Sequence, residues 1–123
     1  MQLTKNFNMN EFASRDGADF PWAIRGHLQE LAENLQALRT LLGVPIMVTS
    51  GYRSPYWNSK VGGASRSYHM KGMAADIVAP GYPPEQLKNK ILFLINEGIM
   101  KPGGLKAYST FVHYDTRGTL TLF

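Results

Sequence analysis

An apolar stripe with helical spacing is the strongest constraint on how this 123-residue chain can fold. Between Pro21 and Leu42, large apolar residues recur at intervals of 4, 3, 4, 3 and 4; they are Ile24, Leu28, Leu31, Leu35, Leu38 and Leu42. This spacing places them on one face of an α-helix. Pro21 suits the first helical turn, and Gly43 and Pro45 favour its end. We therefore expect a long helix over residues 21–42.

The rest of the chain alternates short apolar runs with turn residues, which predicts smaller elements around that helix. Shorter helices are expected over 54–62 and 83–98. Strands are expected over 46–49, 74–78, 105–108, 111–115 and 120–123, the last three separated by tight turns. This order predicts an α+β fold with helices packed on a small antiparallel or mixed sheet. The length suits one domain over 1–123.

The absence of cysteine narrows the chemistry that the chain can perform. It excludes a disulfide scaffold, a thiol nucleophile and every zinc site built on thiolates. A metal site would therefore depend on histidines and carboxylates. Of the three histidines, His27 lies in the long helix beside the apolar stripe, where a surface position is expected. His69 and His113 remain as candidate ligands.

Asp76 completes a candidate metal site with these two histidines. It lies in the expected strand 74–78, at a position where core residues would be expected, and a buried carboxylate needs a partner. His113 lies in the middle of the expected strand 111–115. Two imidazoles and one carboxylate form a recognised zinc set that leaves a position for water. The same three residue types bind iron(II) in oxygenases, so the spacing does not distinguish zinc from iron. Each of the three residues could also have an ordinary structural role.

Several motifs together resemble the M15 family of zinc peptidases. The segment 67–76 reads Ser-x-His-x-x-Gly-x-Ala-x-Asp, and Val-His-Tyr-Asp at 112–115 supplies the later histidine. Ser-Gly-Tyr-Arg-Ser-Pro at 50–55 and Val-Gly-Gly at 61–63 also resemble that family, which includes D-alanyl-D-alanine carboxypeptidases and L-alanyl-D-glutamate endopeptidases. The likeness covers about residues 46–118. The segment 6–13 is similar to the start of the short single-domain subgroup.

The resemblance implies a fold, a cofactor and residue roles. The expected fold is that of hedgehog-like and DD-peptidase-like zinc peptidases, with Zn²⁺ held by His69, Asp76 and His113. Arg53 would bind substrate and take part in catalysis, because a guanidinium beside zinc can stabilise an oxyanion. Ser67, two residues before His69, would contact the substrate or a group that supports the metal ligands.

The general base is where this sequence departs from the family pattern. Many relatives carry Glu three residues before the last ligand, or His two residues before it. Here those positions hold Thr110 and Phe111, and neither can accept a proton. Asp115 is the remaining candidate, because it shares a strand face with His113. It could act on the metal-bound water as the base, or it could orient a ligand.

These features predict hydrolysis of an amide in the peptide stem of bacterial peptidoglycan, by a carboxypeptidase or an endolysin-like endopeptidase. The alternative is a non-catalytic, zinc-containing module that recognises the cell wall. The net charge of +4 suits an anionic wall, whereas the scattered Lys and Arg residues do not predict nucleic-acid binding.

Localisation is predicted from what the sequence lacks. No apolar run reaches the roughly 18 residues of a membrane helix, and the N-terminus shows no secretory signal. We expect a monomer that is made in the cytoplasm and acts at the cell wall, with release at lysis if a phage encodes it.

Overall fold

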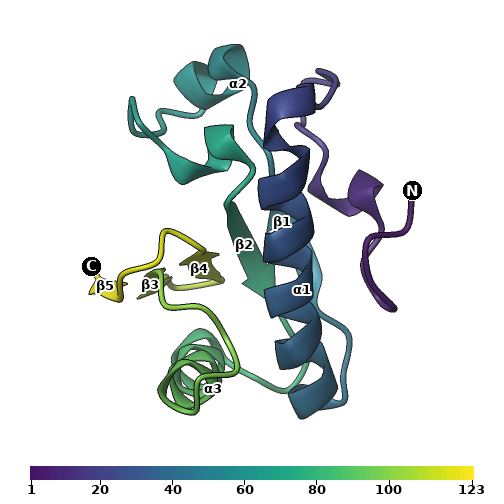
Figure 1. The fold of residues 1–123 in the computed structure, drawn as a ribbon. Helices are drawn as coiled ribbons and strands as arrows, with labels where there is room; N and C mark the ends of the chain where they lie inside the picture. Colours follow the sequence, from purple (N-terminus) through teal and green to yellow (C-terminus); the bar gives the residue numbers. More distant parts are fainter.

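Three helices and one five-stranded sheet make up the fold, which a computed structural model describes for all of residues 1–123 (Figure 1). The helices are α1 (Arg25–Leu42), α2 (Pro55–Lys60) and α3 (Pro84–Asn96). The strands are β1 (Met47–Ser50), β2 (Ala74–Val78), β3 (Gly104–Ala107), β4 (Val112–Asp115) and β5 (Thr121–Leu122). Short 3₁₀ turns occur at η1 (Met9–Phe12), η2 (Trp22–Ile24) and η3 (Tyr68–Lys71). The predicted α+β class is confirmed.

The sheet is mixed, with the strand order β1-β2-β4-β3-β5. Every neighbouring pair is antiparallel except β3 and β5, which run parallel. A tight turn joins β3 to β4, as the sequence predicted. The chain does not form a second hairpin after β4, because β5 pairs with the far side of β3.

The predicted long helix begins four residues later than expected, at Arg25. The first residues of the predicted helix form the 3₁₀ turn η2 instead. No side chain caps the start of α1, and a 3₁₀ turn is a common way to begin such a helix. The helix ends at Gly43, which has a positive φ of 69°, as the sequence predicted. No helix of the protein combines the length and apolarity needed to cross a membrane. His27 is exposed on α1, outside the core.

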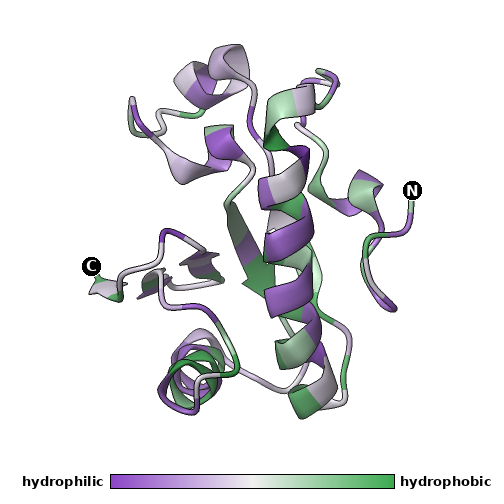
Figure 2. Ribbon diagram, viewed as in Figure 1, coloured by the Kyte–Doolittle hydropathy of each residue, from purple (hydrophilic) through white to green (hydrophobic).

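The core lies on one face of the sheet, beneath α1 and α3. The leucines of the predicted stripe are fully buried except Leu42, which is 7% exposed, and they join a cluster of 22 buried residues. Figure 2 shows apolar and polar residues in alternation along α1, as expected for a helix that buries one face. From the sheet, the side chains of Ala75, Ile77, Val112 and Tyr114 belong to this cluster. The residues that alternate with them, including Asp76, His113 and Asp115, therefore face the opposite side.

Candidate metal centre

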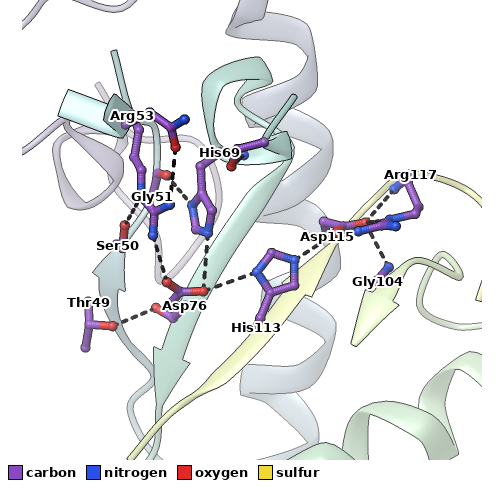
Figure 3. Close-up of polar contacts among 12 residues, drawn as sticks. Thr49, Ser50, Gly51, Arg53, His69, Asp76, Gly104, His113, Asp115 and Arg117 are labelled. Atoms are coloured by element: carbon purple, nitrogen blue, oxygen red, sulfur yellow. Dashed lines mark hydrogen bonds and ion pairs between the residues drawn. The ribbon is translucent and has the colours of Figure 1, made fainter. Parts of the chain in front are cut away.

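The three predicted metal ligands lie together on the face of the sheet away from the core. Asp76 on β2 pairs in register with His113 on β4, so their side chains lie side by side. The turn η3 brings His69 over the same point, and Gly72 ends that turn with a positive φ of 70°. Asp76 Oδ1 lies 3.3 Å from His69 Nε2 and 3.3 Å from His113 Nδ1. Figure 3 shows both rings directed at this carboxylate.

Hydrogen bonds on the outer side of each imidazole determine which nitrogen is free. His69 Nδ1 lies 2.8 Å from the carbonyl oxygen of Gly51, which can only accept, so Nδ1 carries the proton and Nε2 is free. His113 Nε2 lies 2.8 Å from Asp115 Oδ2, which leaves Nδ1 free. One ligand atom from each of His69, Asp76 and His113 lies within 4.8 Å of the other two. This donor set fits a divalent transition metal such as zinc.

The electrostatics also suit a cation. Burial raises the pKa of Asp76, but the neighbouring imidazoles of His113 and His69 outweigh this effect and hold that pKa at about 2. Burial lowers the pKa of His113, but the neighbouring carboxylates of Asp115 and Asp76 outweigh this effect and raise that pKa above its usual value. A buried carboxylate that stays ionised beside two imidazoles is a site that a metal ion would stabilise.

Arg53, expected to bind substrate, lies directly beside Asp76. Its Nη2 is 3.4 Å from Asp76 Oδ2, its Nε is 3.2 Å from Ser50 Oγ and its Nη1 is 3.4 Å from Asn58 Oδ1. Its backbone N–H also donates to the carbonyl of His69 at 3.1 Å. The guanidinium is therefore held in place next to the candidate metal ligands.

Ser67 caps the turn η3, which carries His69. Its Oγ accepts a hydrogen bond from the His69 backbone N–H at 3.2 Å. The hydroxyl proton is not used in that contact and can be donated to another group. Arg53 and Ser67 both line the same cavity as His69, Asp76 and His113.

Asp115, predicted either as the general base or as a residue that orients a ligand, lies behind the His113 ring and not in the cavity. It is fully buried and is not among the residues that line the cavity. Burial raises its pKa, but hydrogen bonds from His113 and Arg117 outweigh this and lower the pKa well below its usual value. Both oxygens are occupied, on the side of the His113 ring away from Asp76. The geometry fits the other predicted alternative, in which Asp115 orients His113.

A cavity of about 460 Å³ opens over the three candidate metal ligands. The loop between α2 and η3 contributes Val61, Gly62, Gly63, Ala64, Arg66 and Ser67, and the C-terminal strands and their flanking loops contribute Tyr108, Phe111, His113, Arg117 and Phe123. Tyr108 and Phe111 stack with ring centroids 4.6 Å apart, and Phe123 meets the His113 ring edge-on at 5.5 Å. The cavity therefore combines aromatic side chains with arginines.

Residues 2–115 match the family described as Peptidase M15. The chain belongs to the peptidase M15 family. The resemblance predicted from the motifs is thereby confirmed.

Two curated relatives are similar to this M15 family member over part of their length. Zinc D-Ala-D-Ala carboxypeptidase of Streptomyces albus G is 56% identical over 46 residues, which are 37% of this chain and 18% of that protein. Peptidoglycan L,D-endopeptidase MepK of Escherichia coli (strain K12) is 36% identical over 95 residues, which are 70% of this chain and 49% of that protein. The chain thus spans half or less of the length of these relatives.

A solved structure supports the fold of this M15 family member. The crystal structure of Serratia marcescens L-Ala D-Glu endopeptidase ChiX aligns with a TM-score of 0.51 and 21% sequence identity. The alignment covers 89% of this chain and 93% of that chain. It confirms the predicted peptidase fold.

Two residues at this M15 site were not predicted from the sequence. Arg117 donates from Nε to Asp115 Oδ1 at 2.9 Å and from Nη2 to Asp115 Oδ2 at 2.7 Å, and its guanidinium lies 4.4 Å from the centre of the Tyr68 ring. Gly104 donates its N–H to Asp115 Oδ1 at 2.8 Å, and a β-carbon there would overlap the Asp115 carboxylate. The spacing Asp115-x-Arg117 directly after a predicted strand was the signal that could have identified the pair.

Proposed function

We propose that this chain is a zinc-dependent peptidase that hydrolyses an amide bond in the peptide stem of bacterial peptidoglycan. The observation that carries the proposal is the convergence of His69 Nε2, His113 Nδ1 and Asp76 Oδ1 in an open cavity beside Arg53. The proposal takes residues 1–123 as one peptidase domain. It draws support from two relatives whose names describe action on peptidoglycan or on D-Ala-D-Ala.

Zinc is the metal that we assign to His69, Asp76 and His113. The same donor set serves iron(II) in oxygenases, but membership of a peptidase family and the name of the Streptomyces relative favour zinc. When bound, zinc supplies Lewis acidity that activates water and polarises a substrate carbonyl.

The protein's own side chains have separate tasks in this proposal. The Arg53 guanidinium, fixed by Ser50, Asn58 and Asp76, stabilises negative charge that develops on the carbonyl oxygen of the substrate. The Ser67 hydroxyl donates a hydrogen bond to the bound peptide. Asp115 accepts a hydrogen bond from His113 Nε2–H and so keeps Nδ1 free.

A second candidate function is a non-catalytic, zinc-containing module that recognises the cell wall. It is favoured by the composition of the cavity, where the only carboxylate and imidazoles among the lining residues belong to Asp76, His69 and His113. Thr110 is exposed outside that lining, and Phe111 lines the cavity with an apolar ring, so neither supplies a base. Turnover of a peptide substrate separates the two candidates.

The proposed substrate also accounts for the charge of the protein. A net charge of +4 favours approach to an anionic cell wall. We propose action at the cell wall, by a monomer, after synthesis in the cytoplasm, with release at lysis if a phage encodes the chain.

Mass spectrometry of purified muropeptides tests the proposed function directly. Zinc-loaded protein should remove a defined mass from the stem peptide, and this mass identifies the bond that is cut. His113→Ala should bind no zinc and release nothing, whereas Asp19→Asn, at an exposed position outside the cavity, should behave as wild type. Binding of muropeptides without any mass change in the wild type would favour the recognition module instead.

A further inference from the structure

Three arginines line the cavity, and they differ in how far the protein already uses them. Arg53 directs three of its N–H groups at Ser50, Asn58 and Asp76. Arg117 donates two side-chain hydrogen bonds to the Asp115 carboxylate, and its guanidinium lies over the Tyr68 ring. Arg66 makes no side-chain hydrogen bond, ion pair or ring contact with any other residue of the chain. Its five N–H donors are therefore available to a ligand.

The cavity also holds no carboxylate that could neutralise the charge of Arg66. Among the lining residues the only acid is Asp76, whose oxygens already face His69, His113 and Arg53. The carboxylate of Asp115 is turned to Arg117 and His113, away from the cavity. An anionic group on a ligand would meet an uncompensated guanidinium at Arg66.

Arg66 lies in the same cavity as the candidate metal site. It adjoins Ser67, whose hydroxyl caps the turn of the metal ligand His69. Arg66 and Ser67 therefore belong to one loop at the rim of the cavity, while Arg53 lies deeper, against Asp76. A peptide placed with a carbonyl at Arg53 and the metal ligands would extend past this loop.

We propose that Arg66 binds a free carboxylate of the peptide substrate and thereby selects stems that carry this carboxylate over stems in which it is amidated. The inference rests on the proposed peptidase function and assigns to Arg66 a role separate from that of Arg53. A guanidinium suits a carboxylate because it can donate two parallel hydrogen bonds. A peptide carboxylate is favoured over a wall phosphate because Tyr108, Phe111 and Phe123 give the rest of the cavity an aromatic lining suited to a short peptide.

Binding of matched peptides to the zinc-loaded protein tests this assignment. One synthetic stem peptide keeps its free carboxylates, a second carries them as carboxamides, and both have N-methylated amides that resist hydrolysis. In calorimetry the wild type should prefer the acid. Arg66→Gln should lose about 10- to 100-fold in affinity for the acid and little for the amide. Arg66→Lys should keep part of the preference, because it keeps the charge but not the fork of donors.

The control is Arg25→Gln, the same change at an exposed position outside the cavity, and it should leave the preference intact. The same variants assayed with hydrolysable peptides should show the selectivity in kcat/KM. A preference for the acid that survives in Arg66→Gln, or an equal loss for both peptides, would overturn the assignment. Displacement of the acid peptide by glycerol phosphate but not by acetate would also overturn it, in favour of a wall phosphate. Failure of the wild type to bind either peptide would instead count against the proposed function.

Discussion

His113 Nε2 lies 2.8 Å from Asp115 Oδ2, on the side of the imidazole away from Asp76 (Figure 3). This contact leaves Nδ1 of His113 as the nitrogen that faces Asp76 at 3.3 Å. Asp115 is itself fixed by Arg117 and by the N–H of Gly104. This geometry is the basis for our proposal that Asp115 orients His113 as a metal ligand.

Asp115→Asn should weaken zinc binding about 10- to 100-fold, as is usual when the partner of a ligating histidine is changed. The amide is a poorer acceptor for His113 Nε2–H and a poorer partner for Arg117. Competition with a chromogenic chelator measures the affinity. Asp19→Asn serves as the matched control, because Asp19 is exposed and makes no contact with the site.

The Asp115 variant must also be shown to fold, since this side chain is fully buried. Circular dichroism of the metal-free form checks this. Arg117→Gln gives a second reading, because it leaves Asp115 in place but removes two of its hydrogen bonds. Unchanged zinc affinity in both folded variants would refute the orienting role of Asp115.

Arg53→Lys should reduce kcat by about 100- to 1,000-fold, the usual loss when one donor to a developing oxyanion is removed. Lysine keeps the charge but cannot contact Ser50, Asn58 and Asp76 together with one planar group. Steady-state kinetics on a stem peptide measures the effect, with Arg25→Lys as the control. A change confined to KM would mean that Arg53 only binds substrate.

Removal of the metal should lower the melting temperature without unfolding the chain. The 22-residue core lies on the other face of the sheet and includes none of His69, Asp76 and His113. If free zinc is at 100 times its Kd, its loss costs about 2.7 kcal/mol, or roughly 10 °C for a domain of this size. Thermal unfolding with and without chelator measures the shift. Complete unfolding on chelation would identify a structural zinc instead.

Asp16→Asn should destabilise the protein at neutral pH but not in acid. Asp16 accepts hydrogen bonds from Ser14 Oγ and Ser54 Oγ, both at 2.6 Å, and these lower its pKa below the usual 3.8. A lowered pKa in the folded state contributes stability above the unfolded value, and this contribution disappears as the pH falls through the folded value. The difference in melting temperature between wild type and variant should therefore be constant from pH 7 to pH 5 and shrink below about pH 4.

Asp19→Asn is again the control for this pH series, since Asp19 makes no side-chain hydrogen bond in the structure. A difference that persists unchanged at low pH would mean that Asp16 acts through packing rather than through its charge. Ser54 begins α2 directly after Arg53, so loss of this contact should also reduce activity slightly.

The sequence by itself determined the elements that depend on local pattern. The stripe from Ile24 to Leu42 predicted α1 because helical periodicity is a property of neighbouring residues. The same holds for β2, whose bounds Ala74–Val78 match the prediction, and for the positions of His69, Asp76 and His113 within the M15 motifs. Alternation along β4 also placed His113 and Asp115 on one face, as the structure has them.

Only the tertiary structure decided what these residues do to one another. Strand alternation shows that His113 and Asp115 share a face, but it does not show whether both side chains reach the same metal ion. In the structure, Asp115 lies behind the His113 ring. The parallel pairing of β5 with β3 likewise depends on long-range contacts. Arg53, Arg66 and Arg117 look alike in sequence, but only their packing shows which guanidinium the protein has left without a partner. Local periodicity fixes which way a side chain points, whereas hydrogen-bond partners and cavities arise from segments far apart in the chain.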